Sequence, residues 1–306
     1  MAQRAGAVLV HLAAGIGNLV LATPLLLVLQ RAGFVIDLLL DCDYPAAAAL
    51  FRDWGAVRRV LDGARDAWSA EAYRHVIPAV PPFYWPRYAA RYARVAHAVA
   101  RPPEALFYQD EQGFYLRFAA TLGCDIAHPP APFLPVPPDA APGVTPSTVV
   151  LAPGCKTGEM AAKRWPGFVE LAAALRDVAV VGTADDLHDF AGAPMHFAPH
   201  ARMLVDRLGL REAAAAMAAA RAVVANDSGL GHIAAAVGAP TLLLFGPTPY
   251  ATLGRPAPNV TILDAGLPCA PCWFGARFAA CAGRIDCLRQ LSVAQVLAAL
   301  PPAWSG

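Results

Sequence analysis

The sequence predicts an α/β protein made of two similar halves, each built on a parallel sheet. Short apolar runs alternate with helix-like stretches along the 306-residue chain, which is typical of strands joined by crossover helices. Residues 129–147 are rich in proline, lack a periodic pattern and separate the two halves. We therefore expect an N-terminal domain over 1–140 and a C-terminal domain over 141–306, whose sheets face each other across a central cleft.

The composition is that of a folded protein large enough for two cores. Apolar residues make up 57% of the chain and charged residues 15%, which excludes a disordered protein. The net charge of +1 gives no general attraction to nucleic acid. The sequence lacks the ~20 uninterrupted apolar residues of a membrane helix and the layout of a signal peptide. These features favour a cytoplasmic protein.

In the N-terminal half, apolar runs and helical patterns follow one another in a regular order. The expected strands are 6–12, 34–41, 57–61 and 73–80, and the expected helices are 19–31 and 46–55. The C-terminal half repeats the pattern after the proline-rich stretch. Its expected strands are 148–154, 177–182, 222–227 and 240–248, and its expected helices are 165–176, 210–221 and 229–238.

Residues 81–101 combine arginines and aromatic residues at helical spacing. Arg87 and Arg91 fall on one face, while Tyr88 and Tyr92 fall on another. One interpretation is an amphipathic helix that covers a sheet. The other is a basic, aromatic surface for an anionic acceptor or for a membrane.

The stretch "NDSGLGH" lies where an expected strand ends and a helix begins. Asp227 or Ser228 can cap that helix, and Gly229 allows a ligand to approach the backbone closely. The free N–H groups of the first turn and the helix dipole favour an anion. His232 follows Ser228 by four positions, so it lies on the same face and can reach that anion. A plain helix cap with a core histidine is the alternative.

A second anion-binding candidate is the loop "APGCKTGEMAAKRWPGF". Lys156 and Lys163 are the only lysines among 24 basic residues, and a compact ammonium suits a phosphate. The loop is not a Walker A motif. Its candidate donors and flexible positions are Gly154, Lys156, Thr157, Gly158 and Lys163.

A third candidate is "AAGIGN", where Gly15 and Gly17 follow the first strand and a helix begins at Asn18. It lacks the third glycine of a dinucleotide fingerprint.

The cysteines Cys269, Cys272, Cys281 and Cys287 are clustered near the C-terminus. Their spacing suits a structural zinc ion first and iron second, and free or redox-paired thiols are the alternative.

Together these motifs resemble glycosyltransferase family 9, the heptosyltransferases. The resemblance is carried, in order, by "GIGNLVLATPLL", "KRWPGF", "NDSGLGHIAAAVGAPTLLLFGPT" and the cysteine region. It implies a GT-B fold of two Rossmann-like domains with the active site between them. It also implies an inverting, metal-independent transfer from a nucleotide-sugar, typically ADP-heptose, to an acceptor that is often the lipopolysaccharide core. A cytoplasmic reaction with peripheral contact at the inner membrane follows from the same resemblance.

The local motifs and the resemblance together predict site residues. Those expected to bind the donor are Gly154, Lys156, Thr157, Lys163, Gly182, Thr183, Asp227, Ser228, Gly229, Leu230, His232 and, at the rim, Thr248. Those expected to bind the acceptor are Gly15, Gly17, Asn18, Arg87 and Arg91. Lys163 and His232 would stabilise the departing diphosphate in place of a metal ion.

One departure from the family pattern concerns the catalytic base. Family members typically carry an aspartate at the position of Asn18, and an asparagine cannot usefully accept the acceptor's proton. Three interpretations follow. Another carboxylate serves, with Asp41 and Asp43 as candidates; the acceptor needs no strong base; or the chain binds a nucleotide-sugar without catalysis, as a partner of an active transferase.

A nucleotide-dependent oxidoreductase is a further hypothesis. Asp37 lies ~20 residues beyond the glycines, at the distance of a ribose-binding carboxylate. That hypothesis gives the phosphate-binding motifs of the second half no purpose, so we expect a glycosyltransferase. The expected partners are a nucleotide-sugar donor and a glycan, lipid-linked or protein acceptor, with no nucleic acid.

Overall fold

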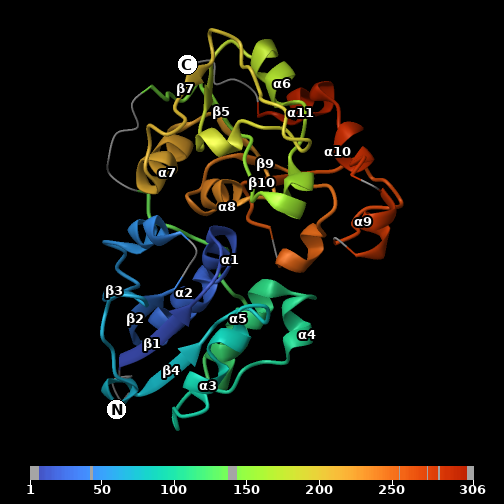
Figure 1. Ribbon diagram of the computed structural model, residues 1–306. Coiled ribbons are helices and arrows are strands. Elements are labelled where there is room, and N and C mark those ends of the chain that lie inside the picture. The colour runs from blue at the N-terminus through green and yellow to red at the C-terminus, as the bar shows by residue number, and fades with distance from the viewer. Residues whose placement is uncertain are drawn as a thin grey trace. The chain divides into compact units, whose positions relative to one another are not determined.

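The chain divides into two compact units, each built on one parallel sheet (Figure 1). The computed structural model describes residues 7–41, 44–136, 143–254, 256–273, 275–281 and 283–301. The N-terminal unit comprises 1–135 with 251–256, and the C-terminal unit comprises 136–250 with 257–306. None of the helices in these described ranges is long and apolar enough to cross a membrane.

The sheet of the N-terminal unit has the strand order β3-β2-β1-β4, with every neighbouring pair parallel. Its strands are β1 (Ala7–Leu12), β2 (Val35–Leu40), β3 (Arg59–Asp62) and β4 (His75–Pro78). Its helices are α1 (Ile16–Leu21), α2 (Thr23–Arg31), α3 (Ala89–Tyr92), α4 (Glu104–Phe107) and α5 (Glu111–Thr121). The β1 and β2 strands are apolar and buried along almost their whole length, as expected of central parallel strands.

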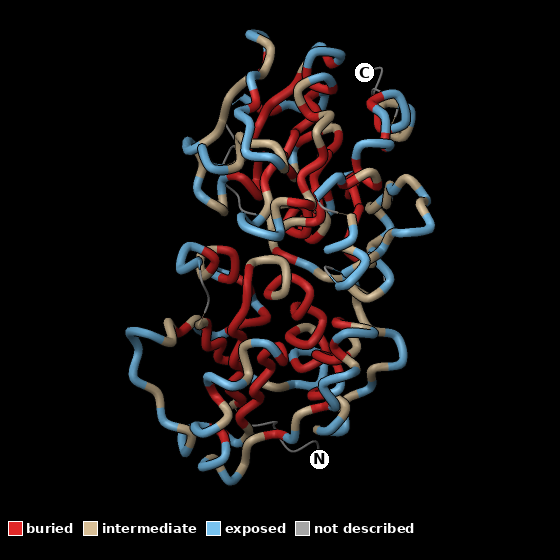
Figure 2. Tube along the Cα trace, turned by 45° about the vertical axis from the view of Figure 1, so that its right-hand side comes forward, coloured by how far each residue is buried: buried red, intermediate tan, exposed pale blue. Residues whose placement is uncertain are grey.

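The sheet of the C-terminal unit has the order β10-β9-β8-β5-β6-β7 and is also parallel. Its strands are β5 (Val149–Ala152), β6 (Val178–Val180), β7 (Arg202–Met203), β8 (Ala222–Asn226), β9 (Thr241–Leu244) and β10 (Val260–Leu263). Its helices are α6 (Phe168–Ala174), α7 (Leu210–Ala219), α8 (Gly229–Ala236), α9 (Ala276–Cys281), α10 (Asp286–Arg289) and α11 (Val293–Ala299). Buried residues gather inside each unit (Figure 2), where β1, β2, β5, β6, β8 and β9 are buried along most of their length.

Two expected helices are wrong in type or extent. The stretch 46–55 forms a 3₁₀ helix, η1 (Pro45–Phe51), and Asp53 then turns the chain with φ 58°. Within 81–101 only η3 (Trp85–Arg87) and the single turn of α3 are helical. The chain then leaves the helix because the Val99 N–H donates to the Val76 carbonyl at the edge of β4.

The segment 251–256 returns to the N-terminal unit from the far end of the sequence. Gly254 has φ +101°, which favours glycine, and a Cβ there would lie 2.7 Å from the side chain of Gln112. Gln112 belongs to α5, so the missing side chain at Gly254 lets the 251–256 segment lie directly against that helix. The sequence pattern did not indicate this return.

Asp37 is a structural residue of β2 and is fully buried. Its carboxylate accepts hydrogen bonds from Arg58 at 2.7 Å and 2.8 Å, from Arg59 at 2.6 Å and from the Tyr73 hydroxyl at 2.8 Å. Burial alone would raise the pKa of Asp37, but these hydrogen bonds and the Arg58 charge lower it below its usual value. A carboxylate bound in this way inside a strand does not support the ribose contact of the oxidoreductase hypothesis.

We predict that Asp37→Asn lowers the free energy of unfolding at pH 7 by about 1–3 kcal/mol, because two arginines lose their charged partner. The folded-state pKa of Asp37 is lowered, so its contribution is complete above the unfolded pKa of about 3.9 and disappears as the pH falls through the folded value. Urea unfolding should therefore show the largest gap between variant and wild type above pH 5, and a shrinking gap below pH 4. Asp125→Asn, at an exposed position, is the control; equal stability of Asp37→Asn and wild type would contradict the prediction.

Candidate functional site

The β8 strand ends at Asn226, and two residues later Ser228 caps α8. The Ser228 hydroxyl accepts from the Gly231 N–H at 3.4 Å, so the expected cap is confirmed with Ser228 in that role. Gly231 lets the helix lie close to the sheet, because a Cβ there would meet the Asn226 carbonyl at 2.8 Å and a Leu243 methyl at 2.6 Å. The N-terminal N–H groups of α8 therefore lie at the carboxyl edge of the sheet.

The Asp227 carboxylate lies beside this turn, is buried, and is surrounded by three donors. The Lys163 ammonium lies 3.0 Å from Oδ2, the Thr248 hydroxyl donates to Oδ2 at 2.8 Å, and Nε2 of His232 lies 3.2 Å from Oδ1. Burial alone would raise the pKa of Asp227, but the Lys163 charge and the His232 ring hold it well below its usual value. We call these four residues the Asp227 cluster.

The position of Lys163 depends on hydrogen bonds made by buried neighbours. The Asn226 side chain accepts from the Trp165 backbone N–H at 3.0 Å and donates to the Pro153 carbonyl at 2.6 Å. The Trp165 indole donates to the Leu291 carbonyl at 2.8 Å. The two Asn226 bonds join both ends of the 153–165 loop to the end of β8, and the indole bond joins the loop to Leu291. The following helix, α6, begins at Phe168 rather than at Trp165.

The other expected donor residues differ in exposure. Lys156 and Thr157 are exposed, while Gly154 is buried. Gly154 and Gly182 both lie against the Asp186 carboxylate, since a Cβ on either would meet Asp186 atoms at 2.0 Å or 2.8 Å. Asp186 also accepts from the backbone N–H of Thr183 at 2.8 Å and from its hydroxyl at 3.0 Å.

Thr248 corrects one expectation. It was expected at the rim of the donor site, yet it is only 6% exposed, because its hydroxyl is bonded to the buried Asp227 carboxylate. Leu230, in the first turn of α8, is partly exposed.

The Lys163 ammonium has three N–H donors, and its bond to Asp227 uses one of them. Because the Lys163 side chain is 15% exposed, its other donors and the start of α8 can together receive an anion.

In the N-terminal unit, Gly15 is the N-cap of α1, and Gly17 and Asn18 lie in its first turn. The Asn18 amide donates to Oε1 of Glu111 at 2.8 Å. Asp41 follows β2 and accepts from the Tyr88 hydroxyl at 2.7 Å. The expected residue Asp43 lies outside the described residues.

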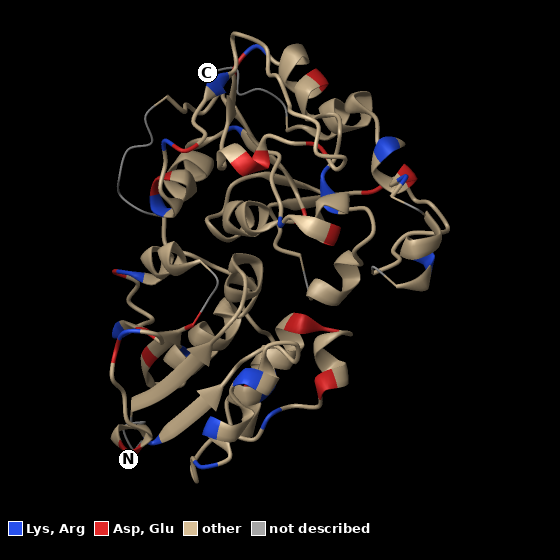
Figure 3. Cartoon of the chain, viewed as in Figure 1, with Lys and Arg blue, Asp and Glu red and all other residues tan. Residues whose placement is uncertain are grey.

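Arg87 and Arg91 are exposed, and Tyr88 and Tyr92 are buried, so the predicted two-sided pattern of this segment is confirmed although the long helix is not. The Arg87 guanidinium lies over the Tyr84 ring with its carbon 4.9 Å from the centroid, and that of Arg91 lies over the Trp68 ring at 5.8 Å. Figure 3 shows basic residues around α3 and acidic residues at the starts of α4 and α5.

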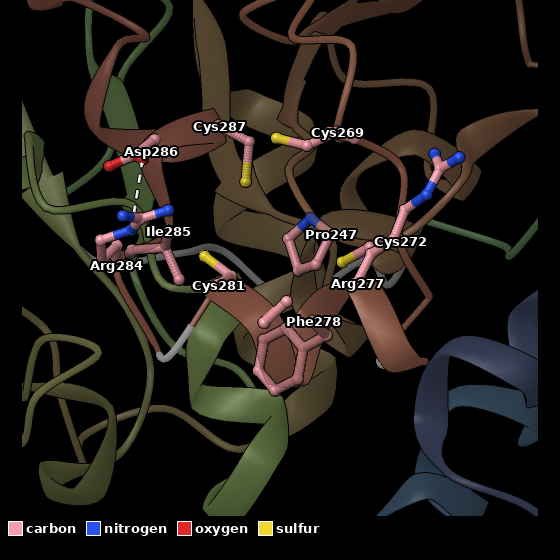
Figure 4. A pocket seen from close by; sticks show the side chains of 12 residues that line it. Pro247, Cys269, Cys272, Arg277, Phe278, Cys281, Arg284, Ile285, Asp286 and Cys287 are labelled. Carbon is pink, nitrogen blue, oxygen red and sulfur yellow. Dashed lines mark ion pairs between the residues drawn. The ribbon is translucent and has the colours of Figure 1, made fainter.

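The four C-terminal cysteines line one cavity together with Pro247, Phe278 and Ile285 (Figure 4). Burial, with a further effect from the other three cysteines, raises the pKa of the Cys287 thiol to about 11. All four are free thiols. Within the described ranges, however, no three His, Cys, Asp or Glu side chains form a group that could hold a metal ion. The four cysteines thus share one cavity, but the described thiols do not form the metal site that their spacing favours.

Sequence reasoning missed Asn226, Asp186 and Glu111. Asn226 was visible as the first polar residue after an apolar strand, but its partners are 61 and 73 positions away. Glu111 had a local signal, because Asp110 caps α5 and accepts from the Gly113 N–H at 2.8 Å. Nothing in the local sequence indicates that Glu111 meets Asn18.

Comparison with known proteins supports the expected family. Residues 133–276 match the family model of glycosyltransferase family 9 (heptosyltransferase). A 69-residue segment is 48% identical to lipopolysaccharide heptosyltransferase 1 of Pseudomonas aeruginosa, and it covers 22% of this chain and 19% of that protein. The sequence match thus spans about a fifth of that relative. These findings confirm the expected resemblance to this family.

Two solved structures share the fold. E. coli ADP-heptose lipopolysaccharide heptosyltransferase II is 19% identical with a TM-score of 0.67, covering 95% of this chain and 96% of that chain. The iron-containing dodecameric glycosyltransferase TibC of enterotoxigenic E. coli H10407 is 16% identical with a TM-score of 0.64, covering 97% of this chain and 78% of that chain. The predicted α/β class with two parallel sheets is confirmed.

Proposed function

We propose that this chain is an inverting glycosyltransferase that transfers heptose, or a similar sugar, from ADP-heptose or a related nucleotide-sugar. The acceptor is a hydroxyl of a lipopolysaccharide-type saccharide or another glycan. The observation that carries the proposal is the Asp227 cluster, which holds the Lys163 ammonium beside the N-terminus of α8. The family resemblance supplies the donor class.

The chemistry requires stabilisation of a departing nucleoside diphosphate, on which negative charge grows as the glycosidic bond breaks. The Lys163 ammonium and the N–H groups at the start of α8 are fixed before the reaction, so they can stabilise that charge without first reorganising. In this scheme Asp227 does not touch the phosphates, because two anions would repel each other. It is a positioning residue for Lys163 and His232.

On the acceptor side, the exposed guanidinium groups of Arg87 and Arg91 suit an anionic saccharide or a lipid-linked acceptor at a membrane surface. This supports a reaction at the cytoplasmic side of the inner membrane with peripheral contact. The alternative function is binding of a nucleotide-sugar without turnover, and the observation that favours it is Asn18 in place of an aspartate.

The direct test is acceptor-dependent release of ADP from ADP-heptose by the purified full chain in buffer containing EDTA, with UDP-glucose and GDP-mannose as competing donors. We expect release from ADP-heptose without added metal, and a rise in melting temperature on addition of ADP. Stabilisation by ADP-heptose without turnover would support the binding alternative. Neither binding nor turnover of any nucleotide-sugar would contradict both functions.

We predict that Lys163→Met lowers kcat by about 10²–10³, because the departing diphosphate loses a fixed positive charge in the transition state. The measurement is the initial rate of ADP release at saturating donor. Arg176→Met is the matched control, since Arg176 is exposed and precedes the amino end of β6, opposite the ligand-binding edge. A Lys163→Met enzyme with the wild-type kcat would reject the role of this lysine.

We also propose that the four-cysteine cavity binds a structural iron or zinc ion, although the described thiols do not form a closed site. Four thiol donors are chemically suited to either ion, and the ion would connect α9 and α10 to the preceding loop without entering the reaction. Elemental analysis of purified protein should find about one ion per chain, lost in Cys272→Ser and retained in Cys124→Ser. A metal-free protein with all thiols titratable would contradict the proposal.

A further inference from the structure

We propose that Glu111 is the general base that accepts the proton of the acceptor hydroxyl, and that Asn18 is the positioning residue that orients its carboxylate. The assignment rests on the proposed function. It deepens that function because it places the missing base on α5.

The first argument is position. Asn18 is the third residue of α1, which follows β1 at the carboxyl edge of the N-terminal sheet. Its amide nitrogen lies 2.8 Å from Oε1 of Glu111, although the two residues are 93 positions apart. Only the NH₂ end of an amide can donate to a carboxylate, so this bond turns the amide oxygen away from Glu111. A carboxylate oxygen therefore lies one hydrogen bond from the place where the resemblance expects an aspartate.

The second argument is the set of donors that surrounds the carboxylate. Glu111 is only 4% exposed and occupies the first turn of α5, where the helix dipole favours a negative charge. The Asn18 amide donates to Oε1 of Glu111, and the Tyr115 hydroxyl approaches the same oxygen at 3.4 Å. Burial first, and then the Glu111 charge, raise the pKa of Tyr115 well above its usual value, so Tyr115 stays a donor. Both neighbours are donors, so the Glu111 carboxylate is the acceptor in both contacts.

The third argument explains the asparagine itself. An aspartate at position 18 would place a second carboxylate within hydrogen-bond distance of Glu111, and two such groups share one proton instead of ionising independently. Asparagine removes that repulsion and supplies a donor. Asn18 and Glu111 thus form a pair in which the amide lies on α1 and the carboxylate on α5, whereas the family pattern places the carboxylate on α1.

In the proposed step, Glu111 takes the proton from the acceptor hydroxyl. The acceptor oxygen forms its bond to the anomeric carbon while the bond from that carbon to the diphosphate oxygen breaks. The bonding electron pair leaves with the nucleoside diphosphate, the anomeric configuration inverts, and the proton passes from Glu111 to water. Asp41 is the competing base, but its carboxylate accepts from Tyr88, whereas the Asn18 amide donates to Glu111.

The test compares Glu111→Gln, Asn18→Asp/Glu111→Gln, Asn18→Ala and Asp41→Asn with wild type in the ADP-release assay. Glu111→Gln should lower kcat by about 10²–10⁴ while the donor-induced rise in melting temperature is unchanged. The double variant exchanges carboxylate and amide, so it should recover at least about tenfold of that loss. Glu104→Gln, an exposed glutamate at the start of α4, is the matched control and should behave as wild type.

The pH profile separates a base from a structural carboxylate. The acidic limb of kcat/KM should disappear in Glu111→Gln and move to higher pH in Asn18→Ala, because a buried carboxylate without its donor protonates more readily. Asn18→Ala keeps Glu111, so it tests the proposal even if Glu111→Gln fails to fold. A wild-type kcat and acidic limb in Asn18→Ala, or loss of activity in Asp41→Asn with full activity in Glu111→Gln, would overturn the assignment. Absence of turnover by wild type would instead refute the proposed function.

Discussion

The arrangement of the C-terminal site depends on one buried anion, the carboxylate of Asp227. A carboxylate is stable in a protein interior only when donors surround it, and here these are an ammonium, a hydroxyl and an imidazole from three separate segments. The same anion therefore fixes the orientation of Lys163 and His232. The contacts that compensate the buried charge thus also position the ammonium to which the proposed function assigns the diphosphate.

Close backbone approaches complete the arrangement. Gly231 brings α8 against β8 and β9, and Gly154 and Gly182 leave room for the Asp186 carboxylate at the ends of β5 and β6. A side chain at any of these glycines would push apart segments whose polar groups must meet. The site thus depends on small residues that contribute no chemistry of their own.

Much of the fold could be predicted because strands of a parallel sheet are continuous apolar runs, as in β1, β5, β8 and β9. The Ser228 cap and the buried face of Tyr88 and Tyr92 also follow from local patterns. Tertiary pairing could not be predicted in the same way. Val99 leaves the expected helix to bond to β4, and Asn18 meets a glutamate 93 positions away. Such contacts depend on the folded chain as a whole.

Because 251–256 belongs to the N-terminal unit, hybrid proteins made by joining halves of two related genes must take this segment into account. A hybrid joined only within the proline-rich stretch would combine α5 of one parent with the 251–256 segment of the other. Gly254 and Gln112 would then come from different ancestors, although their atoms fit together with no room for a side chain. A hybrid that preserves this contact therefore needs two crossovers, so that 251–256 and α5 come from the same parent, or a matched pair of residues at these positions.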